Sequence, residues 1–349
     1  MLDSWVAGSI GAEGNLTRGQ IDDWTLKALK RTVERAAAQS PFYAERLKGL
    51  RISNMEDFKG LPFTYPDDLR RDSLKMLCIP GRDVKRIVSL TTSGSSGEPK
   101  RVYFSERDLL ETVNYFAHGL KEFTKEGEKA LLLFPGSSPD GLNDLIIRAL
   151  EMLGCRGEWF GYPREDRFAE LAERILGQQI TFLIGTAASV AAFARFTEQT
   201  DPAWKIAGQI RGVLASAAYV SEEDRAAIIR AWDCEVNEHY SMTETGYAGA
   251  VGCSVPGGYH VWESGLYYEL IDPVTGIAVP DGEEGEIVVT TLTERAEPFI
   301  RYRTGDIARF VPGRCACGSC LKRLERVHDR DIGKKFERED IENEKICNF

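Results

Sequence analysis

Between residues 129 and 232 the sequence alternates short apolar runs with longer stretches of helical spacing. The apolar runs are residues 131–134, 181–184 and 213–215, each of three or four residues and too short for a helix. An amphipathic stretch follows each of them, at 141–153, 187–196 and 221–232. Short apolar strands that alternate with helices are typical of an α/β domain with a largely parallel sheet. The sequence therefore predicts parallel or mixed sheets flanked by helices.

The two ends of the chain carry different patterns. Residues 19–48 have apolar positions at helical spacing and predict helical structure, whereas 61–69 holds two prolines and predicts a surface connection. In the last third, 267–271 and 285–290 alternate or run apolar between turn residues, which predicts a smaller β-rich subdomain. The predicted division is a helical part (1–85), an α/β part (86–250), the β-rich part (251–330) and a charged tail (331–349).

Composition excludes several classes of function. The 349 residues carry a formal net charge of −10, which argues against binding to nucleic acid through basic side chains. No apolar run approaches the roughly 18 residues that span a bilayer, and the N-terminus lacks the pattern of a signal peptide. We therefore expect a cytoplasmic protein without a membrane partner, whose eight cysteines are free thiols or metal ligands rather than disulfides.

Residues 91–100, TTSGSSGEPK, lie between two expected strands and form a candidate phosphate-binding loop. Glycines let a backbone curl around an anion, and hydroxyl groups donate to phosphate oxygens. The candidate residues are Thr92, Ser93, Gly94, Ser95, Ser96 and Gly97. Lys100 would add a positive charge beside the phosphates. The spacing is not that of a Walker loop, and a flexible Ser/Gly linker is the alternative.

Two further short motifs suit a magnesium nucleotide. Residues 240–244 read YSMTE and combine an aromatic ring, a hydroxyl and a carboxylate, which suit a base, a phosphate and Mg²⁺. Residues 302–306 read YRTGD, and a terminal carboxylate suits ribose hydroxyls. Taken alone, the first motif could be a turn at a strand end and the second a hairpin turn.

In this order, the three motifs resemble those of the acyl-adenylate-forming superfamily, and most closely its phenylacetate–CoA ligase branch. The family signatures are T-S-G-[ST]-T-G-x-P-K and Y-G-x-T-E, so Ser96 stands where threonine is usual and Ser241 where glycine is usual. The stretches 214–223 (LASAAYVSEE) and 286–306 also match the branch, and the resemblance covers roughly residues 55–333. It implies the fold of the large N-terminal domain of adenylate-forming enzymes.

The resemblance also implies roles for single residues. Tyr240 would stack on adenine, Thr243 would contact the α-phosphate, Glu244 would hold Mg²⁺, Asp306 would bind the ribose, and Arg326 would reach ribose and phosphate. The rest of the nucleotide site would comprise Ser216, Ala217, Ala218, Glu238, His239, Ser241 and Met242. The acid would lie against residues 134–141, 185–188 and 216–219, where Phe134, Tyr219 and Tyr247 suit an aryl acid or simply pack.

Four residues form a candidate zinc site: Cys253, His260, Cys315 and Cys317. Three thiolates and one imidazole suit tetrahedral Zn²⁺ in a structural role, and the branch has similar elements. Cys320 is a candidate substitute ligand, and free cysteines are the alternative to a metal site.

The expected activity is that of an acid ligase: a carboxylic acid and ATP give an acyl-adenylate and pyrophosphate. Family members continue into a mobile C-terminal lid with a catalytic lysine, for which residues 329–349 offer no counterpart. We therefore expect the lid to be absent, and transfer to CoA, an amine or a carrier to need a partner protein. The resemblance is also compatible with a homodimer. A degenerate nucleotide- or acyl-binding regulator and a gene fragment are the alternatives.

Overall fold

The computed structural model describes residues 2–90, 99–200, 206–217, 219–255 and 257–329. The chain divides into two compact units. The first unit comprises Glu111–Met242 and Tyr247–Tyr259, and the second comprises Leu2–Leu110, Thr243–Gly246 and the chain from His260 onward. The predicted charged tail lies outside the described residues.

The first unit contains a mostly parallel sheet. Its strands are β3 (Lys129–Leu132), β4 (Arg156–Trp159), β5 (Phe182–Gly185), β6 (Gly212–Ala215), β7 (Glu235–Ser241) and β8 (Gly249–Val251). They lie in the order β8-β7-β6-β5-β3-β4, and each neighbouring pair is parallel except β7 with β8. The α/β fold predicted from the alternating apolar runs is confirmed.

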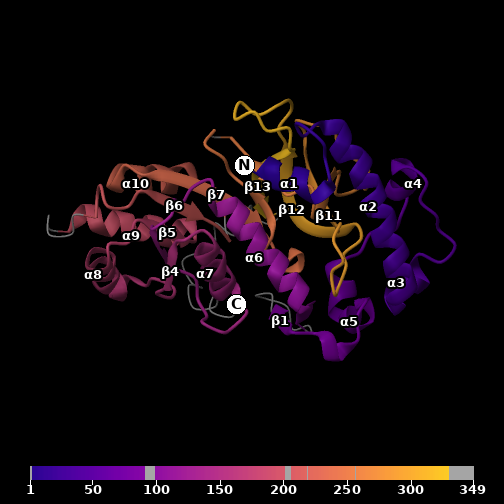
Figure 1. The fold of residues 1–349 in the computed structure, drawn as a ribbon, viewed down its shortest axis with the longest axis horizontal. Helices are drawn as coiled ribbons and strands as arrows, with labels where there is room; N and C mark the ends of the chain where they lie inside the picture. Colours follow the sequence, from indigo (N-terminus) through magenta and orange to yellow (C-terminus); the bar gives the residue numbers. More distant parts are fainter. Residues whose placement is uncertain (1, 91–98, 201–205, 218, 256, 330–349) are drawn as a thin grey trace. The chain divides into compact units, whose positions relative to one another are not determined.

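Helices cover this sheet with the apolar faces that their spacing provides. They are α6 (Glu106–Leu120, whose residues from 111 belong here), α7 (Leu142–Met152), α8 (Phe168–Gln178), α9 (Ala187–Gln199) and α10 (Glu222–Trp232), with a short 3-10 turn η2 (Glu165–Arg167). Helices α8, α9 and α10 pack with strands β3, β5 and β6 into one apolar core (Figure 1). Thr186 and Ser221 cap the N-termini of α9 and α10 with their hydroxyl oxygens.

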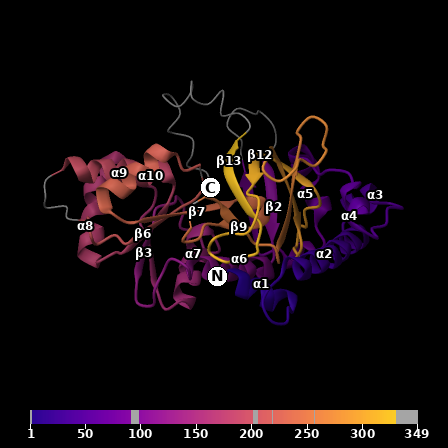
Figure 2. The same ribbon diagram turned by 90° about the horizontal axis from the view of Figure 1, so that it is seen from above.

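The second unit is built on antiparallel strands. They are β10 (Leu266–Ile271), β11 (Glu284–Thr291), β12 (Tyr302–Phe310) and β13 (Arg323–Asp329), paired in that order. β12 and β13 run side by side in Figure 2. A separate hairpin joins β1 (Arg86–Leu90) to β2 (Lys100–Phe104), and β9 (Tyr259–Val261) is a short strand. The β-rich character predicted for residues 267–271 and 285–290 is confirmed.

The N-terminal helices of this unit confirm one prediction and correct another. They are α1 (Leu2–Ile10), α2 (Arg18–Gln39), α3 (Pro41–Arg46), α4 (Met55–Lys59) and α5 (Pro66–Met76), with a 3-10 turn η1 (Gly81–Asp83). The helical structure predicted over 19–48 is confirmed and consists of two helices, because Ser40 ends α2 and caps α3, where Pro41 is the first residue. The surface connection predicted over 61–69 is wrong, because Pro66 begins α5, and Leu61 and Leu69 are buried.

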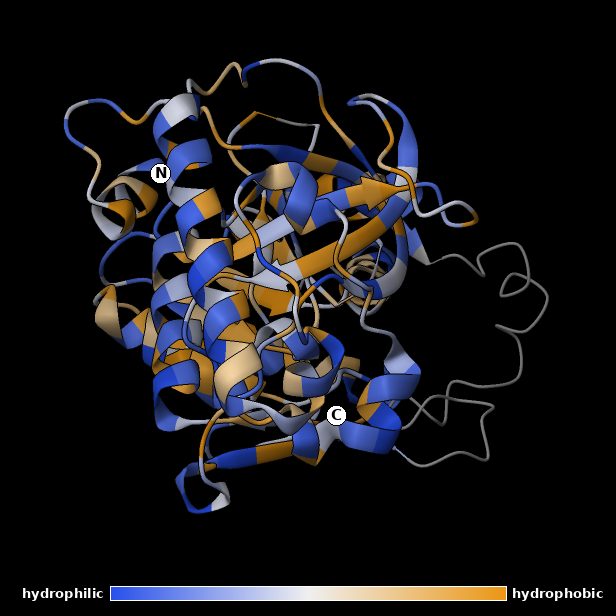
Figure 3. Ribbon diagram, turned by 90° about the vertical axis from the view of Figure 1, so that its right-hand side faces the viewer, coloured by the Kyte–Doolittle hydropathy of each residue, from blue (hydrophilic) through white to orange (hydrophobic). Residues whose placement is uncertain are grey.

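Both kinds of element mix apolar and polar residues. Figure 3 shows blue and orange stretches on strands and helices alike. The described residues contain no helix whose length and apolar character would let it cross a membrane.

Candidate functional site

The candidate phosphate loop connects the two strands of the β1–β2 hairpin. Leu90 pairs with Lys100, so the loop closes this hairpin and Lys100 is the first residue of β2. The loop residues lie outside the described residues: Thr92, Ser93, Gly94, Ser95, Ser96 and Gly97. The structure therefore fixes the two strands that hold the loop and the lysine that follows it.

Lys100, Glu244 and Tyr302 meet in one hydrogen-bonded group in the second unit. Glu244 lies in a 3-10 turn, η3 (Thr243–Thr245), directly after Met242. Lys100 Nζ donates to Glu244 Oε1 at 2.5 Å, and the Tyr302 hydroxyl donates to the same oxygen at 3.0 Å. The side chains of Lys100 and Glu244 are only 15% and 5% exposed. One residue from each of the three sequence motifs therefore contributes to a single buried group.

The YRTGD motif is an irregular part of β12 rather than the hairpin turn that was its alternative. The pairing of β11 with β12 shifts between Glu286 and Val288, and Gly305 has a φ of +84°. Glu286 accepts the Gly305 N–H at 3.2 Å, and Thr304 Oγ1 accepts the Asp306 N–H at 3.0 Å. A bulge of this kind re-aims side chains, and it is a frequent feature next to active sites.

Asp306 and Arg326 lie on neighbouring strands. Asp306 is half-buried on β12, where its backbone pairs with Asp329 of β13. Arg326 is in β13, but its side chain is outside the described part. Asp306 therefore lies in an irregular part of an internal strand, paired with β11 and β13, and its predicted ribose contact stays a prediction.

A second buried polar pair joins β6 to β7 in the first unit. The Ser216 hydroxyl and His239 Nδ1 are 2.8 Å apart, just beyond the carboxyl end of β6. Ligands of α/β folds bind at the carboxyl ends of parallel strands. His239 is buried and packs against the rings of Tyr115 and Phe116, with centroids 5.6 and 5.5 Å away. The sequence placed both residues near the nucleotide, but gave no sign of this contact.

The other predicted nucleotide residues surround this pair in sequence. Glu238 forms an ion pair with Arg225 and accepts the Tyr259 hydroxyl at 2.6 Å. Tyr240 and Ser241 end β7 and are half-buried. Ala217 has a φ of +66°, which L-residues rarely adopt and which is typical of functional loops. Ala218 lies outside the described residues.

The neutral state of His239 gives a prediction about acid stability. Burial lowers the pKa of His239 to about 3 from its usual 6.5. Between these values the unfolded chain binds a proton at His239 that the folded chain does not, so the free energy of unfolding falls as the pH falls. We expect His239→Gln to lose less stability than the unsubstituted chain between pH 6.5 and 4.5, measured by urea unfolding. Parallel stability curves for the two proteins would contradict this.

Two buried carboxyl groups that sequence reasoning missed secure β2. Glu297 Oε2 accepts the Tyr103 N–H at 2.9 Å, and burial raises the pKa of Glu297 well above its usual value. Asp108 Oδ2 accepts the N–H of Ser105 and of Ala296, at 2.7 and 3.1 Å. These contacts fix the strand that carries Lys100. No local pattern marks the contacts of Glu297 with Tyr103 and of Asp108 with Ala296, because these partners are 194 and 188 residues apart in the chain. The contact of Asp108 with Ser105 is local.

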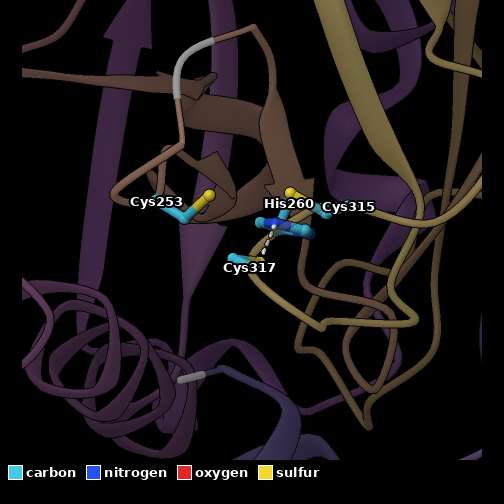
Figure 4. A group of neighbouring side chains, drawn as sticks. All are labelled: Cys253, His260, Cys315 and Cys317. Atoms are coloured by element: carbon cyan, nitrogen blue, oxygen red, sulfur yellow. Dashed lines mark hydrogen bonds between the residues drawn. The ribbon is translucent and has the colours of Figure 1, made fainter.

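The four cysteine and histidine residues predicted to bind a metal lie together. The candidate ligand atoms of Cys253, His260, Cys315 and Cys317 are all within 4.8 Å of one another (Figure 4). Cys317 Sγ is 3.4 Å from His260 Nε2. Cys320, the candidate substitute, instead donates its thiol to the carbonyl oxygen of Leu16 at 3.4 Å.

The aromatic residues proposed for the acid pocket differ in exposure. Phe134 is buried, and its carbonyl oxygen accepts the Trp159 indole N–H at 2.9 Å. Tyr219 is 53% exposed, so it is not ordinary core packing. Tyr247 has a φ of +59° and is half-buried.

A comparison with family models matches residues 85–292, more than half of the chain, to the model described as AMP-binding enzyme. The chain is 27% identical over 300 residues to phenylacetate-coenzyme A ligase of Pseudomonas putida, covering 82% of this chain and 66% of the relative. The corresponding enzyme of Aromatoleum evansii is also 27% identical, covering 87% of this chain and 69% of the relative. The chain thus spans about two thirds of the length of these relatives.

Solved structures agree on the fold. An open conformation of 2-hydroxyisobutyryl-CoA ligase in complex with 2-HIB-AMP and CoA has a TM-score of 0.77 and 21% identity, and the match covers 88% of this chain and 74% of the ligase chain. A long-chain-fatty-acid-CoA ligase from Archaeoglobus fulgidus has a TM-score of 0.54 and 17% identity, and the match covers 72% of this chain and 52% of the ligase chain. At these identities the likeness establishes the fold alone.

Proposed function

Because the chain belongs to the AMP-binding enzyme family, we propose that it activates a carboxylic acid with ATP. A carboxylate oxygen of the acid attacks the α-phosphorus, the bond to the pyrophosphate oxygen breaks, and an acyl-adenylate and pyrophosphate form. The observation that carries this proposal is the buried group of Lys100, Glu244 and Tyr302, which joins the three nucleotide motifs. Holding reactants in line and stabilising the developing charge are the main means of catalysing phosphoryl chemistry.

Each motif residue has a proposed task in this reaction. Lys100 stabilises negative charge on the phosphates, Thr243 donates its hydroxyl to the α-phosphate, and Asp306 accepts from the ribose hydroxyls. Tyr240 stacks on adenine, and the nucleotide-facing backbone comes from residues 216–218 and 238–242.

A magnesium ion fits the donor set at Glu244. Among the described residues, two groups donate to this carboxylate, both to Oε1, and none donates to Oε2. Mg²⁺ is commonly held by one or two carboxylates together with substrate phosphates. When bound, the ion would neutralise part of the phosphate charge.

The test of the proposed activity is acid-dependent exchange of pyrophosphate into ATP. The panel contains phenylacetate, 2-hydroxyisobutyrate and a long-chain fatty acid, which are the acids in the names of the relatives and structural neighbours, together with other aryl acids and short-chain acids. We expect exchange with at least one acid and a rise in melting temperature with Mg·ATP. Binding of ATP without exchange would favour the degenerate regulator, and neither binding nor exchange would overturn the enzymatic proposal.

A structural zinc ion is the second part of the proposal. Three thiols and one imidazole within 4.8 Å match the ligands of closed tetrahedral sites, which leave no position for water. Cys253 and His260 are separated by only six residues, so a short loop links two of the ligands.

Exchange of single cysteines tests the zinc site. We expect one zinc ion per chain by elemental analysis, its loss in Cys317→Ser, and a lower melting temperature because bound metal stabilises the fold. Cys320→Ser is the matched control, since this thiol belongs to the same CACGSC run but bonds to Leu16. A zinc-free unsubstituted protein, or equal zinc in both variants, would contradict the site.

The second half-reaction is proposed on the resemblance. A CoA thiol, an amine or a carrier thiol would attack the acyl carbonyl and release AMP. A partner protein that assists this step, a homodimer and a cytoplasmic location stay predictions from the sequence.

A further inference from the structure

Tyr302 is held rigidly at the start of β12 with its hydroxyl on Glu244. The side chain is fully buried, and its ring packs edge-on against Phe299 with centroids 5.1 Å apart. Both peptide groups that flank Tyr302 bond to the backbone of Thr64. The Arg303 N–H donates to the Thr64 carbonyl oxygen at 2.9 Å, and the Thr64 N–H donates to the Arg301 carbonyl oxygen at 3.0 Å. The position of the hydroxyl is therefore fixed by the backbone and the core.

Glu244, by contrast, lies in a single 3-10 turn of three residues. Such a short turn does little to fix a carboxylate by itself, so the orientation of Glu244 depends on its hydrogen bonds. Its Oε1 receives both of them, from Lys100 Nζ and from the Tyr302 hydroxyl.

When a nucleotide binds, we expect Glu244 to keep the hydrogen bond from Tyr302 and to lose the one from Lys100. In the proposed function Lys100 turns to the phosphates, because its charge is needed there. The Tyr302 hydroxyl is buried and is held in place by the backbone and the core, so it stays on Oε1.

We infer that Tyr302 is a positioning residue that holds Glu244 with Oε2 directed to a divalent cation. The inference rests on the proposed function, in which Glu244 is the metal ligand. Groups that hydrogen-bond to metal ligands orient them, and their removal typically costs 10- to 100-fold in metal affinity. Oε2 accepts no hydrogen bond from the described residues, which leaves that oxygen for the ion.

The test measures how strongly metal and nucleotide binding are coupled. Calorimetry gives the Kd of α,β-methylene-ATP, a non-hydrolysable analogue, in the presence of Mg²⁺ and in the presence of a chelator. The Kd with the chelator divided by the Kd with Mg²⁺ measures the coupling. We expect Tyr302→Phe to lower this ratio about tenfold, with little change in the Kd measured without metal. We expect Glu244→Gln to abolish the coupling.

Tyr43→Phe is the matched control. Tyr43 is also a buried tyrosine of the second unit, and its hydroxyl contacts Thr64 Oγ1 at 3.2 Å and accepts the Ile300 N–H at 3.1 Å. Its loss removes a comparable hydrogen bond near β12 without touching Glu244, so the coupling should stay unchanged. Melting curves of both variants show whether each is folded.

The outcomes separate the inference from its premise. If Glu244→Gln abolishes the coupling but Tyr302→Phe leaves it as in the unsubstituted chain, the positioning role is overturned. An equal loss in Tyr43→Phe and Tyr302→Phe would also overturn it, because the effect would then be structural. If Glu244→Gln itself has no effect, the metal role of Glu244 in the proposed function fails.

Discussion

Replacing Lys100 with methionine is expected to slow acid-dependent pyrophosphate exchange about 10²–10³-fold, the usual effect of removing one group that stabilises developing charge. Lys100 is only 15% exposed and its Nζ lies 2.5 Å from Glu244, so water cannot readily replace it. Methionine keeps much of the length and apolar character of the lysine stem. The measurement is the exchange rate at saturating acid and Mg·ATP, which isolates the chemical step from binding.

A structural explanation of that loss can be separated from a catalytic one. Lys100→Met also leaves Glu244 buried without its charged partner, which destabilises a protein. The double variant Lys100→Met/Glu244→Gln removes the unpaired charge and should regain stability without regaining exchange. Lys129→Met is a control for removal of a lysine from a strand end, because within the described part of the chain Lys129 Nζ bonds a carbonyl oxygen, that of Gln178 at 2.8 Å, and no carboxylate. Exchange within tenfold of the unsubstituted rate in Lys100→Met would contradict the proposed role.

The parallel sheet was predictable because its strands are buried on both faces. Leu131, Leu183 and Val213 are completely buried, and such strands appear in a sequence as uninterrupted apolar runs. Helix α8 was missed although its signal is present: Phe168, Leu171, Ala172 and Ile175 recur at helical spacing and are buried. The break between α2 and α3 also has a local signal, since a serine followed by proline marks the start of a new helix.

The contacts of the candidate site were not predictable, for a different reason. Local patterns identified Lys100 and Glu244, but these residues are 144 positions apart, and Tyr302 is another 58 from Glu244. Tyr302 belongs to the YRTGD motif, yet only its terminal aspartate received a role from the resemblance. Hydrogen bonds between distant segments follow from tertiary packing, which periodicity and composition do not encode. The joint position of the four metal-ligand candidates was anticipated from residue type, whereas bound zinc stays a proposal.

The largest stability effect is expected at Arg301 and Glu269 in the second unit. Arg301 donates to both carboxylate oxygens of Glu269 at 3.1 and 3.0 Å, and also to the carbonyl oxygens of Lys59 and Leu61. The two side chains are 5% and 4% exposed, so neither charge is solvated by water. Removing one partner of a buried pair costs about 3–5 kcal/mol, because the other charge remains buried.

We expect Arg301→Met to lose about 3–5 kcal/mol in denaturant unfolding and to lose hydrogen-exchange protection in β10 and β12. Arg309→Met is the matched control, because the Arg309–Glu325 pair joins β12 to β13 but is 30% and 21% exposed. Pairs near the surface contribute about 0–1 kcal/mol. A loss in Arg301→Met no greater than in this control would contradict the assignment.

The pH dependence of Arg301→Met identifies the unpaired carboxylate as the cause. Burial raises the pKa of Glu269 above 4.5 even beside Arg301, whose charge acts to lower it. Without the guanidinium this pKa rises further, and the folded state then binds a proton that the unfolded chain has released. Stability of the variant must therefore increase as the pH falls toward 4.5, because protonation removes the buried charge. A double variant, Arg301→Met/Glu269→Leu, lacks the carboxylate and should regain part of the lost stability without this rise.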